Sequence, residues 1–144
     1  MTRKVLIAYD GTREGREGLF QFMEVVPLQD AEIHLLAVVR IPTGMFLAEG
    51  YVPEPVLDQE KQRVQDIVDE GVKLLTGRGF RAAAHLAYGE PIEEIVKMAR
   101  ALPAQLIVIG HKRQTSFASR WWKSSVGKSL IELSPCSILV AVCD

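Results

Sequence analysis

The sequence predicts one doubly wound, Rossmann-like α/β domain built around a parallel sheet. Short apolar runs alternate along the chain with longer amphipathic segments, which is typical of repeated βαβ units. The 144 residues are enough for one domain, and an apolar content of 48% is enough to fill one core. The sequence shows no internal repeat, low-complexity tract or linker, so a single domain is expected over residues 1–144.

The N-terminal part is expected to form a buried strand, a helix and a second strand. Apolar runs indicate the strands at residues 4–9 and 32–39. The helix is expected at 14–26, because Thr12 is suited to be its N-cap and Pro27 ends the helical pattern. This order is the first βαβ unit of the predicted sheet.

The longest helix is expected at residues 55–76, after an irregular connection at 41–52 that contains proline and glycine. Gly77 is expected to end this helix. Its apolar positions recur at helical spacing, and they are Leu57, Val64, Ile67, Val68 and Leu75.

The remaining elements continue the alternation. Pro91 is suited to the first position of a helix, which is expected to run to about residue 101. The other expected elements are strands at 80–88, 105–109 and 138–142 and a helix at 125–133.

The charge of the chain is uneven, although its net value is only −1. A balance so close to neutral gives no general argument for binding to nucleic acid or to a membrane surface. Residues 95–131 contain no acid, and their basic side chains are Lys97, Arg100, Lys112, Arg113, Arg120, Lys123 and Lys128. This segment is either a solvated basic face or the rim of an anion-binding site.

No export signal or membrane segment is expected. The first apolar run is too short for a signal peptide, and no run approaches the ~20 residues that span a bilayer. Cys136 and Cys143 flank one expected strand about 23 Å apart, which is too far for them to pair with each other. These features favour a reducing, cytoplasmic setting, without a redox or metal role for either thiol.

Four fragments of the sequence resemble motifs of the universal stress protein family, in the family's order and spacing. They are the strand and turn at 5–12, the Gly-x-Pro-x-x-x-Ile helix start at 89–95, the strand at 106–110, and the tail at 125–126 and 134–140. The resemblance extends over residues 4–142. It implies a sheet of five parallel strands in the order 3-2-1-4-5, with helices on both faces.

The resemblance also implies a homodimer formed through the last strand, which comprises Ser137, Ile138, Leu139, Val140, Ala141 and Val142. The residues themselves indicate an edge that must be covered, because this strand is uncharged and contains no proline. Such an edge aggregates unless another chain or element covers it. The cover is either a second copy or a loop or helix of the same chain.

The candidate site is expected where the strand order reverses, between strands 1 and 4. Asp10 and Gly110 are expected to face each other there across a crevice. Asp10 either accepts a hydrogen bond from a ribose hydroxyl or adenine amino group, or bonds locally to the backbone of Thr12 or Arg13. The resemblance places nucleotide contacts at this aspartate and matches Val38 to a backbone contact with adenine. The candidate nucleotide-binding residues are Ala8, Asp10, Val38, Ile109, Gly110, Arg113, Ser124, Ser125 and Val126.

The expected phosphate loop departs from the glycine pattern of the nucleotide-binding relatives. Arg113 and Ser124 replace two glycines of that pattern, while Gly110 and Ser125 are kept. Arg113 either fills the phosphate space or pairs with a phosphate through its guanidinium. The two serines either donate hydroxyl groups to the anion or only cap the next helix. Weak or absent ATP binding is therefore expected; the candidate cofactor is ATP or AMP, with Mg²⁺ if ATP binds.

Both tryptophans of the chain lie in a basic loop at residues 111–123, together with Phe117. Aromatic and basic residues in such a loop either pack against the end of the core or contact a nucleotide or a protein partner. Packing is the expected role, and binding of nucleic acid is not expected. His111 is expected to be an exposed loop residue.

No catalytic or metal-binding motif is recognisable. Gly-x-Ser-x-Gly and Walker sequences are absent, and Asp10 has no second acid beside the first strand. His34 and His85 have no further ligand at a suitable spacing for a metal. With no catalytic motif beside it, the family resemblance implies a stress-response dimer with a regulatory or binding role. The alternative is a nucleotide-sensing module that binds ATP or AMP in the crevice.

Overall fold

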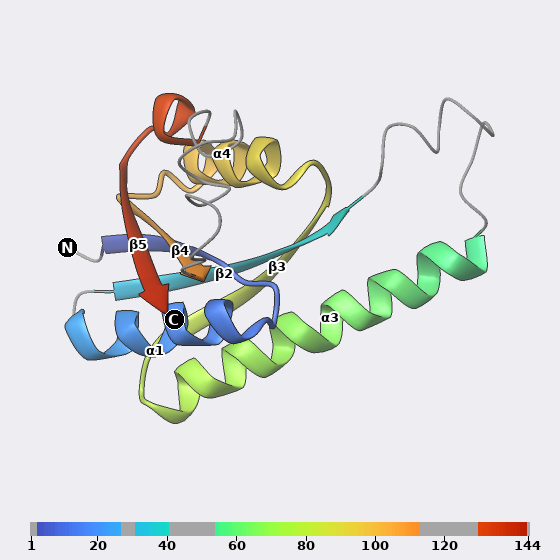
Figure 1. Ribbon diagram of the computed structural model, residues 1–144, viewed down its shortest axis with the longest axis horizontal. Coiled ribbons are helices and arrows are strands. Elements are labelled where there is room, and N and C mark those ends of the chain that lie inside the picture. Colours follow the sequence, from blue (N-terminus) through green and yellow to red (C-terminus); the bar gives the residue numbers. More distant parts are fainter. Residues whose placement is uncertain (1–2, 27–30, 41–53, 113–129, 144) are drawn as a thin grey trace.

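Five parallel strands form one sheet in the order β3-β2-β1-β4-β5. The computed structural model describes residues 3–26, 31–40, 54–112 and 130–143. The doubly wound class, the five parallel strands and their order are confirmed. The elements (Figure 1) are β1 (Arg3–Ala8), α1 (Arg13–Val25), β2 (Ala31–Arg40), α3 (Glu54–Gly77), β3 (Arg81–Gly89), α4 (Pro91–Ala101), β4 (Leu106–Lys112) and β5 (Ser137–Cys143).

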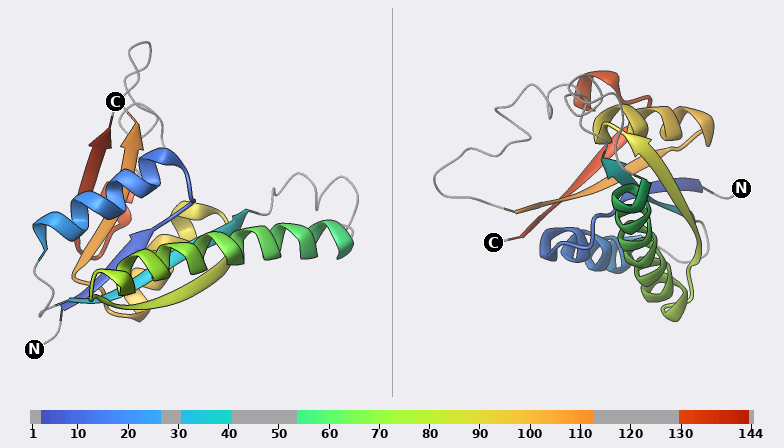
Figure 2. Two further views of the ribbon diagram at one scale, coloured as in Figure 1. Left: turned by 90° about the horizontal axis from the view of Figure 1, so that it is seen from below. Right: turned by 90° about the vertical axis from the view of Figure 1, so that its right-hand side faces the viewer.

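Helices cover both faces of the sheet. α1 and α3 lie on one face and α4 lies on the other (Figures 1 and 2). Successive side chains of a strand point to opposite faces, so Val5 and Ile7 of β1 join the core beside α1 and α3, while Leu6 joins the core beside α4. Because both faces are buried, the central strands are apolar at most positions, which is why apolar runs identify them.

α1 begins at the N-cap that the sequence predicts. The hydroxyl oxygen of Thr12 accepts a hydrogen bond from the backbone N–H of Gly15 at 3.1 Å. The helix ends at Val25, one residue before its expected bound. Phe22 packs against Phe80, with ring centroids 5.7 Å apart. The buried positions of α1 recur at helical spacing, and they are Gly15, Gly18, Leu19 and Phe22.

α3 is the longest described helix, and its N-terminal part extends past the sheet (Figure 1). Residues 55–63 include no buried position. The residue with a left-handed backbone after the helix is Gly79, with φ of 90°, whereas the expected Gly77 is the last helical residue. The buried positions of α3 lie further along the helix, and they are Val64, Val68, Gly71 and Leu75.

β4 continues three residues beyond its expected end at 109. Three pairs with β5 extend it: Gly110 with Ala141, His111 with Val142, and Lys112 with Cys143. Gly110 therefore lies inside a strand. His111 is buried, so the expectation that it is an exposed loop residue is wrong. The strand persists because β5 provides hydrogen-bonding partners, a long-range effect that local propensity does not encode.

Two expected segments lie largely outside the described residues. The connection at 41–52 lies outside them entirely. Of the helix expected at 125–133, only residues 130–133 are described, and they are helical. Leu130 in this turn is buried in the core beside α4.

Candidate functional site

The sheet order creates a switch point between β1 and β4. β1 leads through α1 to β2 on one side, and its other neighbour, β4, is reached from β3 through α4. The carboxyl ends of β1 and β4 therefore meet the N-terminus of α1 at one edge of the sheet. The predicted site residues that the structure describes are Ala8, Asp10, Val38, Ile109 and Gly110. Those that lie outside the described residues are Arg113, Ser124, Ser125 and Val126.

Asp10 lies in a tight turn between β1 and α1. Its Oδ1 accepts hydrogen bonds from the Thr12 backbone N–H at 3.0 Å and from the Thr12 hydroxyl at 2.5 Å. Gly11 has φ of +75°, a conformation that favours glycine. The local bond to Thr12, one of the two roles expected for Asp10, is therefore present. The side chain of Asp10 nevertheless remains exposed, so its carboxylate is accessible to the hydrogen-bond donors of a ligand.

Side chains of α3 contact this turn and the residues on either side of it. A methyl group added at Gly11 would lie 3.0 Å from Ile67, so the turn packs directly on α3. Glu70 pairs with Arg16 of α1 at 2.5 Å and lies 3.5 Å from the hydroxyl of Tyr9. Burial raises the pKa of that hydroxyl above its ordinary value, so it stays a neutral donor. These contacts fix the position of the backbone that carries Asp10.

Gly110 lets the first turn of α1 pack against β4. A methyl group added at Gly110 would overlap the carbonyl group of Glu14 and would lie 3.1 Å from the Cα of Gly15. A methyl group added at Gly18 would lie 3.2 Å from the Cα of Gly110. The missing side chain at Gly110 is thus required by helix-to-strand packing. The sequence predicts a phosphate-site role for Gly110 and not this packing role. Gly15 and Gly18, three residues apart on α1, are the sequence signal from which the close approach of the helix could have been found.

Asp10 and Gly110 both lie against Gly15. The Oδ1 atom of Asp10 is 2.7 Å from the position that a Cβ of Gly15 would occupy, and this glycine also touches Gly110. The two residues are therefore neighbours, as expected, with the first turn of α1 between them. In this turn the N–H of Gly15 donates to the Thr12 hydroxyl, and the N–H groups of Arg13 and Glu14, which precede the first bond within the helix, are the ones that can bind an anion.

The other three described site residues point to the opposite face of the sheet. Ala8 and Val38 are half-buried and Ile109 is buried, and all three pack in the core beside α4. Their side chains therefore serve the core, and only their backbone groups at the end of the sheet can meet a ligand. The sequence predicts that they lie at this end of the sheet. It does not show that their side chains belong to the core while only their backbone groups are available to a ligand.

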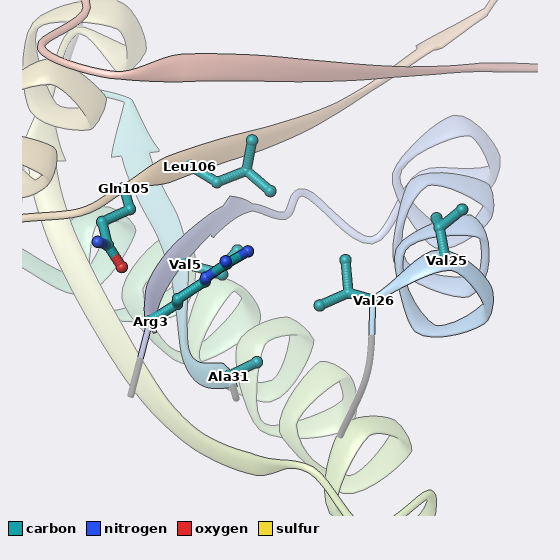
Figure 3. Close-up of a pocket in the computed structure, with 7 residues that line it drawn as sticks. All are labelled: Arg3, Val5, Val25, Val26, Ala31, Gln105 and Leu106. Carbon is teal, nitrogen blue, oxygen red and sulfur yellow. The ribbon is translucent and has the colours of Figure 1, made fainter. Parts of the chain in front are cut away.

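A cavity of about 640 Å³ lies at the other end of the sheet (Figure 3). Its lining comes from the beginnings of β1, β2 and β4 and from the end of α1, where no site residue was predicted. The lining residues are Arg3, Val5, Val25, Val26, Ala31, Gln105 and Leu106. Several of them adjoin segments outside the described residues, so the cavity is not assigned to the candidate site.

Other site classes find little support within the described part of the chain. No group of three or more His, Cys, Asp or Glu side chains there could hold a metal ion. In the same residues, no helix is long and apolar enough to cross a membrane. β5 lies at the edge of the sheet, as the resemblance implies for the dimer strand, and its Val142 is 39% exposed.

Comparison with known proteins agrees with this architecture. The model of the Universal stress protein family matches residues 1–141. Universal stress protein YxiE from Bacillus subtilis is 30% identical over 150 aligned positions, which cover 97% of this chain and 99% of the relative.

Two solved structures of similar fold contain adenine nucleotides. A universal stress protein family protein from Arabidopsis thaliana, with AMP bound, is 15% identical, with a TM-score of 0.72 and coverage of 99% of this chain and 92% of that one. The universal stress protein from Archaeoglobus fulgidus in complex with dAMP is 18% identical, with a TM-score of 0.66 and coverage of 96% of each chain.

Proposed function

This chain belongs to the universal stress protein family, and from that premise we propose that it is a regulatory, non-catalytic stress-response protein. In this proposal it works as a cytoplasmic homodimer and binds an adenine nucleotide weakly at the edge between β1 and β4. The observation that carries the proposal is the exposed carboxylate of Asp10, held on a rigid turn at the switch point.

The position of Asp10 supports a nucleotide over other small ligands. A carboxylate accepts hydrogen bonds from the two hydroxyl groups of a ribose, and the free N–H groups of α1 attract the phosphate of the same molecule. Both features lie at the edge where doubly wound sheets bind their ligands. Relatives of the same fold contain AMP and dAMP, which supports an adenine base.

The proposal of weak binding rests on the phosphate side of the site. The backbone of Glu14 packs against the Cα of Gly110. A phosphate therefore cannot approach this Cα closely. The sequence provides Arg113 and Ser124 where glycines would permit that approach. We propose that Arg113 fills the phosphate space. The second candidate function, a tightly binding nucleotide sensor, requires Arg113 to pair with the phosphate instead.

Calorimetric titration with AMP, and with ATP and Mg²⁺, tests this assignment. We expect a Kd of about 1 mM or weaker, corresponding to about −4 kcal/mol of binding free energy. Asp10→Ala should remove the remaining heat because the ribose loses its acceptor. Asp58→Ala removes an exposed carboxylate near the start of α3, nine residues before the Ile67 that packs on the Asp10 turn, and is the matched control, which should bind as the wild type does. Micromolar binding, or binding that survives Asp10→Ala, would contradict the proposal.

The same titration of Arg113→Gly separates the two roles of this arginine. If Arg113 fills the phosphate space, the glycine variant should bind AMP about tenfold more tightly, since glycine admits the phosphate to the backbone. Weaker binding would show that the guanidinium pairs with the phosphate and would favour the tight sensor. Unchanged affinity would rule out both roles.

We propose that β5 forms the dimer contact. This edge strand is uncharged from Ser137 to Val142, and an edge of that kind associates with another strand unless it is blocked. Val142→Lys should convert the dimer to a monomer, because lysine on an edge strand opposes strand-to-strand association. Sedimentation equilibrium would then give one chain mass, 16.0 kDa, where the wild type gives two.

Val25→Lys is the control for this variant. Val25 is also an exposed valine, at 69%, but it is the last residue of α1 and not part of the edge strand. The Val25→Lys variant should therefore remain a dimer. A wild-type chain that sediments as a monomer, or a Val142→Lys variant that remains dimeric, would refute β5 as the dimer contact.

A further inference from the structure

Two histidines and a glutamate form a hydrogen-bonded row across β2 and β3. The Nε2 atom of His34 lies 2.8 Å from Oε1 of Glu32, and its Nδ1 atom lies 2.8 Å from Nε2 of His85. All three side chains lie on the face that α4 covers, and His34 is buried. His34 and His85, named here the histidine pair, link the edge strand β3 to β2.

The geometry limits the number of protons that the histidine pair can carry. Glu32 accepts the Nε2–H of His34, so in the neutral pair the Nδ1 atom of His34 must accept the Nε2–H of His85. A first additional proton breaks neither bond: it binds at Nδ1 of His85, and the proton between the rings can then lie on Nδ1 of His34, so that His34 carries the charge. A second additional proton places an N–H group on both nitrogen atoms that face each other, Nδ1 of His34 and Nε2 of His85. The hydrogen bond between the rings then cannot persist.

The surroundings oppose the second proton. Burial lowers the pKa of His85, and the charge of His34 lowers it further. The pKa of Glu32 is lowered mainly by its hydrogen bond with His34, with smaller effects of Lys4 on β1 and Arg81 on β3. Glu32 therefore stays ionised while the histidine pair titrates.

α4, which also packs over this region, adds no charge at the histidine pair. Its buried positions are Ile95, Val96 and Ala99. Its charged side chains Glu93, Lys97 and Arg100 are exposed, and Glu94 lies beside Gly89. Among the described side chains, Glu32 is therefore the acid that balances the protons of the pair.

We propose that the histidine pair is an acid-sensitive link between β2 and β3, which holds while it carries at most one additional proton and opens when it binds the second. Among the described strands β3 pairs only with β2, and it leads directly into α4. Opening of the link would loosen the edge of the sheet and the start of α4. The link would thereby respond to acidification of the protein's surroundings, independently of nucleotide binding.

The direction of the pH dependence follows from the lowered pKa of His85. An unfolded histidine has a pKa of about 6.5, so the unfolded chain binds this proton at a higher pH than the folded chain does. The contribution of the histidine pair to stability is complete above about pH 6.5. It is lost as the pH falls through the lowered pKa of His85.

Amide hydrogen exchange, corrected for its intrinsic pH dependence, provides the test. On going from about pH 7.5 to about pH 5, exchange in β3 should become at least about tenfold faster, while β1 at the centre of the sheet should change little. His85→Gln should abolish this change, because glutamine donates to Nδ1 of His34 but cannot be protonated. Equal acceleration in wild type and His85→Gln, or none in wild type, would overturn the proposal.

His111→Gln is the matched control, since His111 is the other buried histidine in the described residues and lies on β4. It should keep the acceleration in β3, and its loss there would assign the effect to His111 instead. Ring ¹⁵N chemical shifts of the wild type give a second readout that depends on no variant. They should show the histidine pair titrating in two separated steps; one common step would also overturn the proposal.

Discussion

Gly110→Ala is expected to lower the free energy of unfolding by about 3 kcal/mol or more, and to abolish any nucleotide binding at the edge between β1 and β4. The added methyl group would overlap the backbone of Glu14 and crowd that of Gly15. Neither backbone can turn away as a flexible side chain can, so α1 must move off β4. Urea denaturation monitored by circular dichroism measures the loss.

Gly77→Ala is the control for this prediction. Apart from its chain neighbours and the backbone of its own helix, no described atom lies within 4 Å of the position where its methyl group would be placed, and its φ is not in the left-handed region. Alanine there should be neutral or stabilise by up to about 1 kcal/mol. If Gly110→Ala were as stable as the wild type, the close packing of α1 on β4 would be wrong, and Gly110 would be free to admit a phosphate.

Phe22→Ala is expected to cost about 3–5 kcal/mol of unfolding free energy. Phe22 is fully buried between α1 and the sheet, and its ring packs against Phe80. Its removal leaves a cavity that strands on one side and helices on the other cannot easily close. Since small domains have about 5–15 kcal/mol in total, the variant should unfold at a much lower urea concentration.

Val25→Ala, at the last residue of α1, is the control for this prediction. Val25 is 69% exposed at the end of the same helix, so its truncation should change stability by no more than about 0.5 kcal/mol. A loss below about 1 kcal/mol for Phe22→Ala would contradict the packing of α1 against this face of the sheet.

The sequence predicts much of the fold because burial on both faces makes the strands visible as apolar runs. Thr12 and Pro91 locate helix starts correctly, since caps and first-turn prolines act locally. The strand order came from the family resemblance and not from periodicity. The end of β4 was misplaced because its last three residues are held by β5, which lies some thirty residues further along the sequence.

The sequence predicted which residues of the candidate site lie together but not all of the contacts that they make. Asp10 and Gly110 were expected near each other, and they are neighbours through Gly15. That Gly110 serves helix packing could not be inferred, because the approach of α1 to β4 is a tertiary contact. The histidine pair was missed for the same reason: the two rings are 51 residues apart and meet only through the register of β2 and β3.

The most direct test of weak nucleotide binding at this edge is an NMR titration of ¹⁵N-labelled protein with AMP. Weak binding at this edge should produce gradual shifts of backbone amides at Ala8, Asp10, Gly11, Val38 and Gly110, approaching saturation only at about millimolar AMP. Saturation at micromolar AMP would establish the tight sensor instead. Absence of shifts, or shifts confined to the cavity at the other end of the sheet, would contradict the assignment of the site.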